Sequence, residues 1–236
     1  MEKQKDTITF TYRFTFPDGK IEYFPVALNT KDLTLVGPQI KATPEWTRLS
    51  FHKCPQCPLN ELHYADCPTA VSMLSLVNFC KDLESCQQVT VTVESAQRNY
   101  VKKTSLQGGL SSLAGIYMAA GGCPVLAKLR PLVRFHLPFA DNDETAYRVF
   151  SMYILAQYFL AKQGKPADWT MAKLAETYRR IAQVNRAFCE RLREVVTNDA
   201  GVNAVIALDA FALFIQTSID VNNTQELENI FRAYLE

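Results

Sequence analysis

Residues 8–26 read ITFTYRFTFPDGKIEYFPV, two arms of aromatic and β-branched residues on either side of a short polar segment. Apolar and polar residues alternate along both arms, and Asp18 and Gly19 supply residues that favour a tight turn. One face of the first arm carries its apolar residues, namely Ile8, Phe10, Tyr12 and Phe14. The stretch therefore predicts an antiparallel β-hairpin with one apolar and one polar face.

Further extended segments are predicted in the first half of the chain. Residues 88–95 (QVTVTVES) and 98–104 (RNYVKKT) have the pattern of a second hairpin. Residues 47–51 (TRLSF) predict one more strand, which leads directly into a group of cysteines.

The pattern becomes helical from residue 69 onward, where apolar residues recur at intervals of three and four. Asp141, with Glu144 three residues later, predicts a capping box at the start of a helix. That helix should end near Gly164, and Asp168 can cap the long amphipathic helix that follows.

Two helical segments have unusual compositions. Residues 202–219 are strongly apolar but include Asp209, which would be costly inside a membrane, so we expect a buried helix. Residues 107–122 predict a helix with one face of very small side chains, which favours tight packing against another element. This face consists of Ser111, Gly115 and Ala119.

Strands come first and helices follow, without an internal repeat, so the sequence predicts an α+β fold. We expect a small N-terminal antiparallel sheet with hairpins, a cysteine-rich zinc loop and a C-terminal helical bundle. The chain could form a β-hairpin lobe (1–50) and a domain with the cysteine-rich loop and most helices (51–236). One continuous domain (1–236) is the alternative.

Charge and composition narrow the classes of function. Twenty-five Lys and Arg against twenty-four Asp and Glu give a net charge of +1, which disfavours nucleic-acid binding. The N-terminal residues lack the apolar core of an export signal, and the seven cysteines are an odd number. We therefore expect a cytoplasmic protein with reduced thiols and no membrane span. Common nucleotide-binding, hydrolase, metalloprotease and kinase signatures are absent from the sequence, which lowers the expectation of an enzyme.

Residues 51–68, FHKCPQCPLNELHYADCP, contain three cysteines and two of the three histidines of the chain. Zinc prefers four tetrahedral thiolate or imidazole ligands, and structural sites often begin with Cys-x2-Cys. The segment resembles a retroviral zinc knuckle with a shifted histidine, but it lacks the glycines of that motif, so no nucleic-acid role follows. His52 is an alternative ligand, because on a strand it would point to the same side as Cys54. The spacing predicts a structural zinc ion bound by Cys54, Cys57, His63 and Cys67.

Two other interpretations of these cysteines stay open. Cys54-Pro-Gln-Cys57 resembles the redox motif of thioredoxin-like proteins, but Pro58 and the lack of a βαβ pattern argue against it. The thiols could also be plain buried hydrophobic groups. An iron–sulfur centre could draw on more distant cysteines, although the nearby imidazoles favour zinc. These more distant candidates are Cys80, Cys86 and Cys123.

A second group of chemically suggestive residues lies in the middle of the chain. Cys123 follows two glycines, and together with His136 it could form a nucleophile and base. If residues 132–137 are extended, Arg134 and His136 project to one side and, with Arg130, could receive an anionic ligand. Structural roles for the cysteine and the histidine, and ion pairs for the arginines, are the alternatives.

The sequence also resembles an uncharacterised family of bacterial proteins, classed as a domain of unknown function. The family pattern runs H-x-C-x2-C-P-L, H-x2-C-P, S-G-C-P and R-F-H-L-P, and the similarity covers roughly residues 48–235. The matching blocks are FHKCPQCPL, HYADCP, LSSLAGIYMAAGGCP, RPLVRFHLPFA and ETAYRVFSMYILAQYF. The resemblance implies a bacterial cytosolic protein, supports Cys54, Cys57 and Cys67 as a set, and supplies no reaction. His63 is a weaker ligand, because three residues separate it from Cys67 where the family has two.

Three hypotheses of function follow. The first is a zinc-stabilised regulatory module that binds a protein partner or a small anionic ligand. The second is an enzyme that uses Cys123 with His136, or an open metal site, on an anionic substrate. The third, binding of single-stranded nucleic acid through the cysteine loop, is weaker because the charge is balanced. A homo-oligomer is compatible with each hypothesis.

Overall fold

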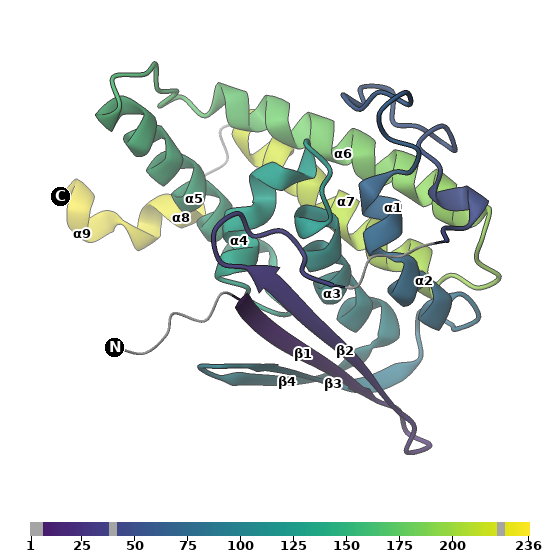
Figure 1. Ribbon diagram of the computed structural model, residues 1–236. Coiled ribbons are helices and arrows are strands. Elements are labelled where there is room, and N and C mark those ends of the chain that lie inside the picture. The colour runs from purple at the N-terminus through teal and green to yellow at the C-terminus, as the bar shows by residue number, and fades with distance from the viewer. Residues whose placement is uncertain (1–6, 38–41, 221–224) are drawn as a thin grey trace, which may run out of the picture.

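The computed structural model describes residues 7–37, 42–220 and 225–236. Two hairpins form one antiparallel four-stranded sheet in the order β2-β1-β3-β4 (Figure 1). The strands are β1 (Thr7–Thr15), β2 (Ile21–Asn29), β3 (Gln88–Ser95) and β4 (Asn99–Ser105). The two hairpins predicted from the alternating patterns are confirmed.

The first hairpin forms as its sequence dictates. The first turn is closed by Asp18, whose side chain accepts a hydrogen bond from the Lys20 amide at 2.9 Å, and by Gly19, whose φ of 87° suits glycine. The apolar residues of β1 face inward, and Phe10, Tyr12 and Phe14 are buried.

The N-terminal hairpin shares its sheet with a hairpin much later in the chain. Tyr12 of β1 pairs with Val93 of β3 in the antiparallel register. The boundary expected at residue 50 therefore separates strands of one sheet, and a single hydrophobic core takes side chains from both sides of it.

Helices make up most of the remaining chain, in agreement with the predicted α+β class. The helices are α1 (Pro68–Ser72), α2 (Leu74–Cys80), α3 (Leu106–Ala120), α4 (Arg130–Arg134), α5 (Asn142–Lys162), α6 (Ala172–Arg193), α7 (Ala200–Asp220), α8 (Gln225–Ile230) and α9 (Arg232–Leu235). Helix α3 packs on β3 and β4 and also on α7, and α6 packs on α7. The sheet, α3 and the α6–α7 pair therefore lie in successive layers (Figure 1).

The small residues of α3 bring it close to both of its neighbours. A Cβ on Gly109 would lie 2.7 Å from Val91 Cγ2 and 2.8 Å from Phe14 Cε1, so the helix can approach the sheet only with glycine there. On another face, a Cβ on Gly115 would lie 3.7 Å from Leu208 Cδ2 of α7. Helix α3 therefore contacts α7 beside its small face, although there is room for an added Cβ at Gly115.

The predicted start of α5 is also confirmed. The Asp141 side chain accepts a hydrogen bond from the Glu144 amide at 2.9 Å, and the Glu144 side chain accepts one from the Asp141 amide at 3.0 Å. Before α6, Asp168 accepts a hydrogen bond from the Lys173 amide at 2.8 Å, although Met171 occupies the cap position itself.

The strand predicted for residues 47–51 is wrong. The chain forms a 3-10 turn at Glu45–Thr47, which the Thr47 hydroxyl stabilises by donating to the Pro44 carbonyl at 2.7 Å. Only Arg48 then makes an isolated bridge, to Asp66. The alternating pattern there is too short to compete with this local hydrogen bonding.

Within the described residues, one helical segment, Ala200–Ile219 of α7, is long and apolar enough to cross a membrane by length and composition alone, with a mean hydropathy of 1.7. In the fold this helix packs against α3 and α6, and Val205 and Ile215 are buried in the hydrophobic core. Asp209 near its middle forms an ion pair with Arg186 of α6 at 3.3 Å.

Candidate functional site

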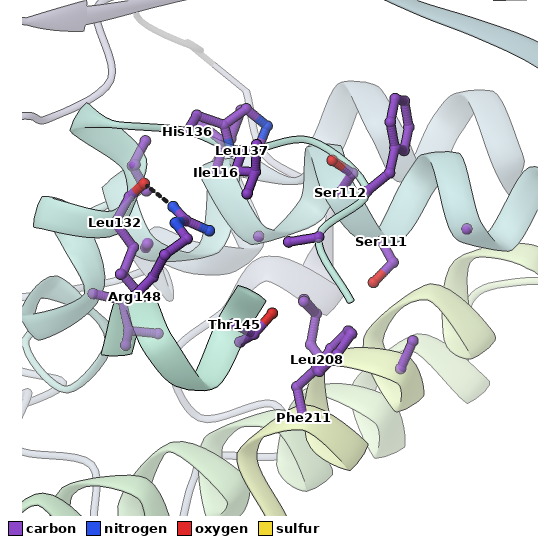
Figure 2. A pocket seen from close by; sticks show the side chains of 18 of the residues that line it. Ser111, Ser112, Ile116, Leu132, His136, Leu137, Thr145, Arg148, Leu208 and Phe211 are labelled. Carbon is purple, nitrogen blue, oxygen red and sulfur yellow. Dashed lines mark hydrogen bonds between the residues drawn. The ribbon is translucent and has the colours of Figure 1, made fainter. Parts of the chain in front are cut away.

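A cavity of about 340 Å³ lies among α3, α4, α5 and α7 (Figure 2). Its wall is mostly apolar, and Leu208 and Phe211 reach toward it from α7. The polar groups of the wall come from several parts of the fold. They are Lys102 and Thr104 of β4, Ser111 and Ser112 of α3, His136, which follows α4, Thr145 and Arg148 of α5, and Tyr178 of α6.

The cavity exists because α3 is narrow where it faces α7. Ser111, Gly115 and Ala119, the small face noted in the sequence, all line the cavity. Side chains this small cannot fill the space between two helices, although they allow the helices to pack next to it. One sequence feature therefore accounts for both the helix contact and the cavity.

Arg148 supplies a positive charge in this wall. Its Nη2 donates a hydrogen bond to the carbonyl oxygen of Leu132 at 2.8 Å (Figure 2). It donates another to the carbonyl oxygen of Phe135 at 3.0 Å, at the end of α4. Burial lowers the pKa of the guanidinium, but arginine keeps its proton at neutral pH. In the described part of the chain, Nε and Nη1 make no hydrogen bond, so Arg148 retains donors for a ligand.

His136 belongs to a buried hydrogen-bond chain. Its Nε2 lies 2.5 Å from the Tyr12 hydroxyl, which lies 2.8 Å from the Ser112 hydroxyl. Burial lowers the pKa of His136 to about 3, and the positive charge of Arg148 contributes to the shift. The imidazole is therefore neutral near pH 7, so it adds a hydrogen-bonding group but no charge to the cavity.

The predicted anion site at Arg130, Arg134 and His136 is not assembled as expected. The condition for that site, an extended segment 132–137, is not met, because α4 continues through Arg134. Pro131 lies in the first turn of this helix, where its fixed φ suits the helix and its missing amide proton is not needed.

The two arginines of that prediction do not line the cavity. Arg130 donates to the Asp32 carbonyl oxygen at 3.3 Å, and the Arg134 guanidinium lies 5.3 Å from the centroid of the Phe135 ring. Of the three predicted residues only His136 lies in the wall, and the basic residues there are Arg148 and Lys102 instead. The sequence contained one signal for Arg148, a lone basic residue within the apolar run YRVFSMYILAQYFL.

The cysteine-rich loop lies beside α1 and close to α6 (Figure 1). Cys54 and Cys57 share a tight turn in which the Cys57 amide donates to the Cys54 carbonyl at 3.0 Å. Cys67 stands directly before α1, and its amide donates to the Thr47 carbonyl at 2.7 Å. These three cysteines are partly buried against the edge of the fold.

Cys123, which follows α3, is brought to the same loop. A Cβ on Gly122 would lie 3.2 Å from the Pro68 Cβ, so the chain next to Cys123 contacts the chain next to Cys67. Pro58 and Pro124 line one common cavity of about 200 Å³. The two residues that flank Cys123 therefore lie near the prolines that directly follow Cys57 and Cys67.

The electrostatics of the thiols agree with this proximity. Burial raises the pKa of Cys54 to about 12, and the thiolates that raise it further are Cys67, Cys57 and Cys123. Burial also raises the pKa of Cys123.

The two histidines considered as zinc ligands lie at the surface. His63 is exposed. His52 is also exposed; its Nε2 lies 3.9 Å from Glu194 Oε1, and its ring packs against Phe51. Over residues 7–37, 42–220 and 225–236, no three or more His, Cys, Asp or Glu side chains are arranged to hold a metal ion, and the seven cysteines are free thiols.

The structure also separates the candidate nucleophile from its candidate base. His136 lines the large cavity and Cys123 does not. Cys123 lies beyond the C-terminal end of α3, whereas Tyr12, the partner of His136, bonds to Ser112 within that helix.

Comparison with protein families identifies the chain. The family model described as domain of unknown function (DUF6901) matches residues 10–232. The chain belongs to this family. The matched segment of DUF6901 runs from β1 to the start of α9, so it contains the sheet, the cysteine loop and the cavity. No curated protein and no solved structure matches the chain.

One signal in the sequence of this DUF6901 chain could have grouped Cys123 with the loop. Four cysteines are each followed directly by proline: Cys54, Cys57, Cys67 and Cys123. The other three are followed by other residues: Cys80 by Lys81, Cys86 by Gln87 and Cys189 by Glu190. The four Cys-Pro pairs are the ones that the fold brings together.

Proposed function

We propose that this protein is a non-catalytic binding module for a small, mostly apolar molecule with an anionic end. The ligand occupies the cavity among α3, α4, α5 and α7, with its anionic end at Arg148. In this proposal the zinc ion expected in the cysteine loop stabilises the fold and does not contact the ligand.

The observation that carries the proposal is the presence of the Arg148 guanidinium in an apolar cavity of about 340 Å³. Ligand pockets have volumes of roughly 300–1,000 Å³ and combine apolar walls with a few polar groups that orient the ligand. The uncommitted Nε and Nη1 donors of Arg148 suit a carboxylate, because hydrogen bonds between oppositely charged groups are stronger than neutral ones. The hydroxyls of Ser111 and Thr145 in the same wall can accept or donate further bonds.

The other two hypotheses have less support. His136, with a pKa of about 3, is a weak base at neutral pH, and Cys123 lies outside the cavity wall. Lys53 in the cysteine loop pairs with Glu61 at 2.9 Å, which offsets a charge that a nucleic-acid backbone would need.

Binding can be tested with three probes of equal chain length: decanoate, decanol and decylamine. We expect isothermal titration calorimetry to give the tightest binding for decanoate, weaker binding for decanol and the weakest for decylamine, because Arg148 repels a cation. Arg148→Met should lower the decanoate affinity by about tenfold or more, since a hydrogen bond to a charged group contributes roughly 1.5–3 kcal/mol. Binding of decanol, which does not need the charge, should change little and so reports that the cavity is intact.

Two control variants sharpen this test. Arg134→Met removes a nearby arginine that does not line the cavity, and it should leave the decanoate affinity unchanged. Ser111→Leu adds bulk inside the cavity and should weaken both decanoate and decanol. Equal affinity for decanoate and decanol, or unchanged binding in Ser111→Leu, would refute the proposal.

A further inference from the structure

Arg191 of α6 is a buried cation without an acidic partner. Its side chain is 2% exposed, and Nη1 donates to the carbonyl oxygens of Trp46 and, at 2.9 Å, of Arg48. The guanidinium also lies 5.7 Å from the centroid of the Phe51 ring. No carboxylate forms an ion pair with it in the part of the chain that the structure describes.

A buried charge of this kind is unfavourable unless an opposite charge lies nearby. The Trp46 and Arg48 carbonyls that accept from Arg191 flank Thr47, whose carbonyl accepts a hydrogen bond from the Cys67 amide at 2.7 Å. The thiols of Cys67, Cys54 and Cys57 therefore lie near enough for their charge to act on Arg191. A free thiol is mostly uncharged at neutral pH, whereas a thiolate bound to a metal carries its negative charge permanently. The position of Arg191 is therefore explained if these sulfurs are held as thiolates.

We propose that Cys54, Cys57, Cys67 and Cys123 bind one zinc ion, with Cys123 in place of His63 or His52 as the fourth ligand. Four thiolates and one Zn²⁺ give a centre with a net charge of −2, and the four thiol protons go to solvent. Arg191 then offsets part of this negative charge. A set of four sulfurs is a common tetrahedral structural site for zinc.

The fold places the four residues for this role. The Cys54–Cys57 turn provides the Cys-x2-Cys pair, and the contact of Gly122 with Pro68 sets Cys123 beside Cys67. Because the described side chains do not form a coordinating group in this structure, the cysteines must turn toward one another about their single χ1 torsion when the ion binds.

This centre would connect two segments that are far apart in the sequence. The loop of residues 51–67 has little regular structure, and the ion would fasten it to the C-terminal end of α3. The inference does not depend on the proposed ligand, because none of the four cysteines lines the large cavity.

The test begins with the fully reduced wild-type protein and needs no substitution. We expect elemental analysis to give one zinc ion per chain after dialysis against micromolar zinc sulfate. Iodoacetamide followed by mass spectrometry should then show the four Cys-Pro thiols protected in the zinc form and reactive after chelation. Cys86, which is exposed, should react in both forms. No bound zinc, or protection that omits Cys123, would overturn the proposal.

Variants then identify the fourth ligand. Cys123→Ser should lower zinc affinity at least a hundredfold, whereas His63→Ala, His52→Ala and the matched control Cys86→Ser should keep it within about twofold. Cobalt(II) should give the thiolate charge-transfer band of four sulfurs in the wild type and a weaker band in Cys123→His, which retains a ligand if Cys123→Ser does not fold. Loss of zinc in His63→Ala with retention in Cys123→Ser would reverse the assignment.

Discussion

The hydroxyl of Tyr12 on β1 lies 2.5 Å from Nε2 of His136, the residue that lines the cavity two positions after α4. The two residues are 124 positions apart in the chain. Tyr12 is fully buried, and its hydroxyl also reaches Ser112 of α3 at 2.8 Å. The sheet, α3 and the cavity wall are therefore joined by one chain of hydrogen-bonded polar groups. Removal of one member of this chain should lower stability by more than the loss of a single surface hydrogen bond.

Replacement of Tyr12 tests this chain directly. Tyr12→Phe should lower the free energy of unfolding by about 1–3 kcal/mol, because it removes the hydroxyl that bonds to the partly buried side chains of His136 and Ser112. Tyr23→Phe is the matched control, since Tyr23 is 56% exposed and its loss should change stability by less than about 0.5 kcal/mol. Urea denaturation measures both variants, and equal effects would mean that the Tyr12 hydroxyl contributes no buried bond.

His136 should make the stability depend on pH. Its folded-state pKa of about 3 lies below the ordinary value of 6.5, so the unfolded chain binds a proton more readily than the folded one. The stabilisation from neutral His136 is complete above pH 6.5 and is lost as the pH falls from 6.5 toward 3. The expected slope is about 1.4 kcal/mol per pH unit, or roughly 2 kcal/mol between pH 6.5 and 5.

The measurement is the urea midpoint between pH 7.5 and 5, a range above most carboxylate titrations. His136→Gln keeps a hydrogen-bonding group without a titration there, so its stability should vary much less. A wild-type profile as flat as that of His136→Gln would show that the histidine is not held neutral by burial.

The close approach of α3 to the sheet predicts a strong effect at Gly109. Gly109→Ala places a Cβ 2.7 Å from Val91 and 2.8 Å from Phe14, so it should destabilise the protein by about 1–3 kcal/mol despite the better helix propensity of alanine. Gly37→Ala is a suitable control, because nothing lies within 4 Å of the added atom. Thermal unfolding of the two variants should separate them clearly, and similar midpoints would argue against tight packing at Gly109.

Replacement of Arg191 should affect the stability of the zinc-free protein and its zinc affinity differently. Arg191→Met removes an isolated buried cation but also the hydrogen bonds to the Trp46 and Arg48 carbonyls, so without metal the two effects should offset and stability should change little. With zinc the variant loses the positive charge beside the thiolates, and its zinc affinity should fall by about tenfold or more. Arg193→Met, at an exposed residue paired with Glu190, should change neither quantity appreciably. Competition with a chromogenic chelator measures the affinity, and equal values for all three proteins would contradict the electrostatic role of Arg191.

Local patterns in the sequence predicted the hairpins, the capping box of α5 and the small face of α3, because each depends on residues close together in the chain. Residues 47–51 and 132–137 show where this reasoning failed. In both segments, the alternation of a few residues was outweighed by a local alternative, the hydroxyl of Thr47 in one and the helix-starting Pro131 in the other.

The candidate sites follow the same division. The sequence alone indicated Cys54, Cys57 and Cys67 as a set and drew attention to His136. It could not show that Arg148 rather than Arg130 or Arg134 shares a wall with that histidine, since α4 turns the two earlier arginines away from the cavity.

By itself, the sequence determined the two hairpins, the start of α5 and the small face of α3, because alternation and helical periodicity are properties of neighbouring residues. Only the tertiary structure decided which residues that are distant in the sequence lie next to one another. It set Cys123 next to the cysteine loop, left Arg191 buried without a carboxylate, and opened a cavity along the small face of α3. The physical reason is that such contacts depend on how segments distant in the sequence pack together. A local sequence pattern carries no information about the distance between two such segments.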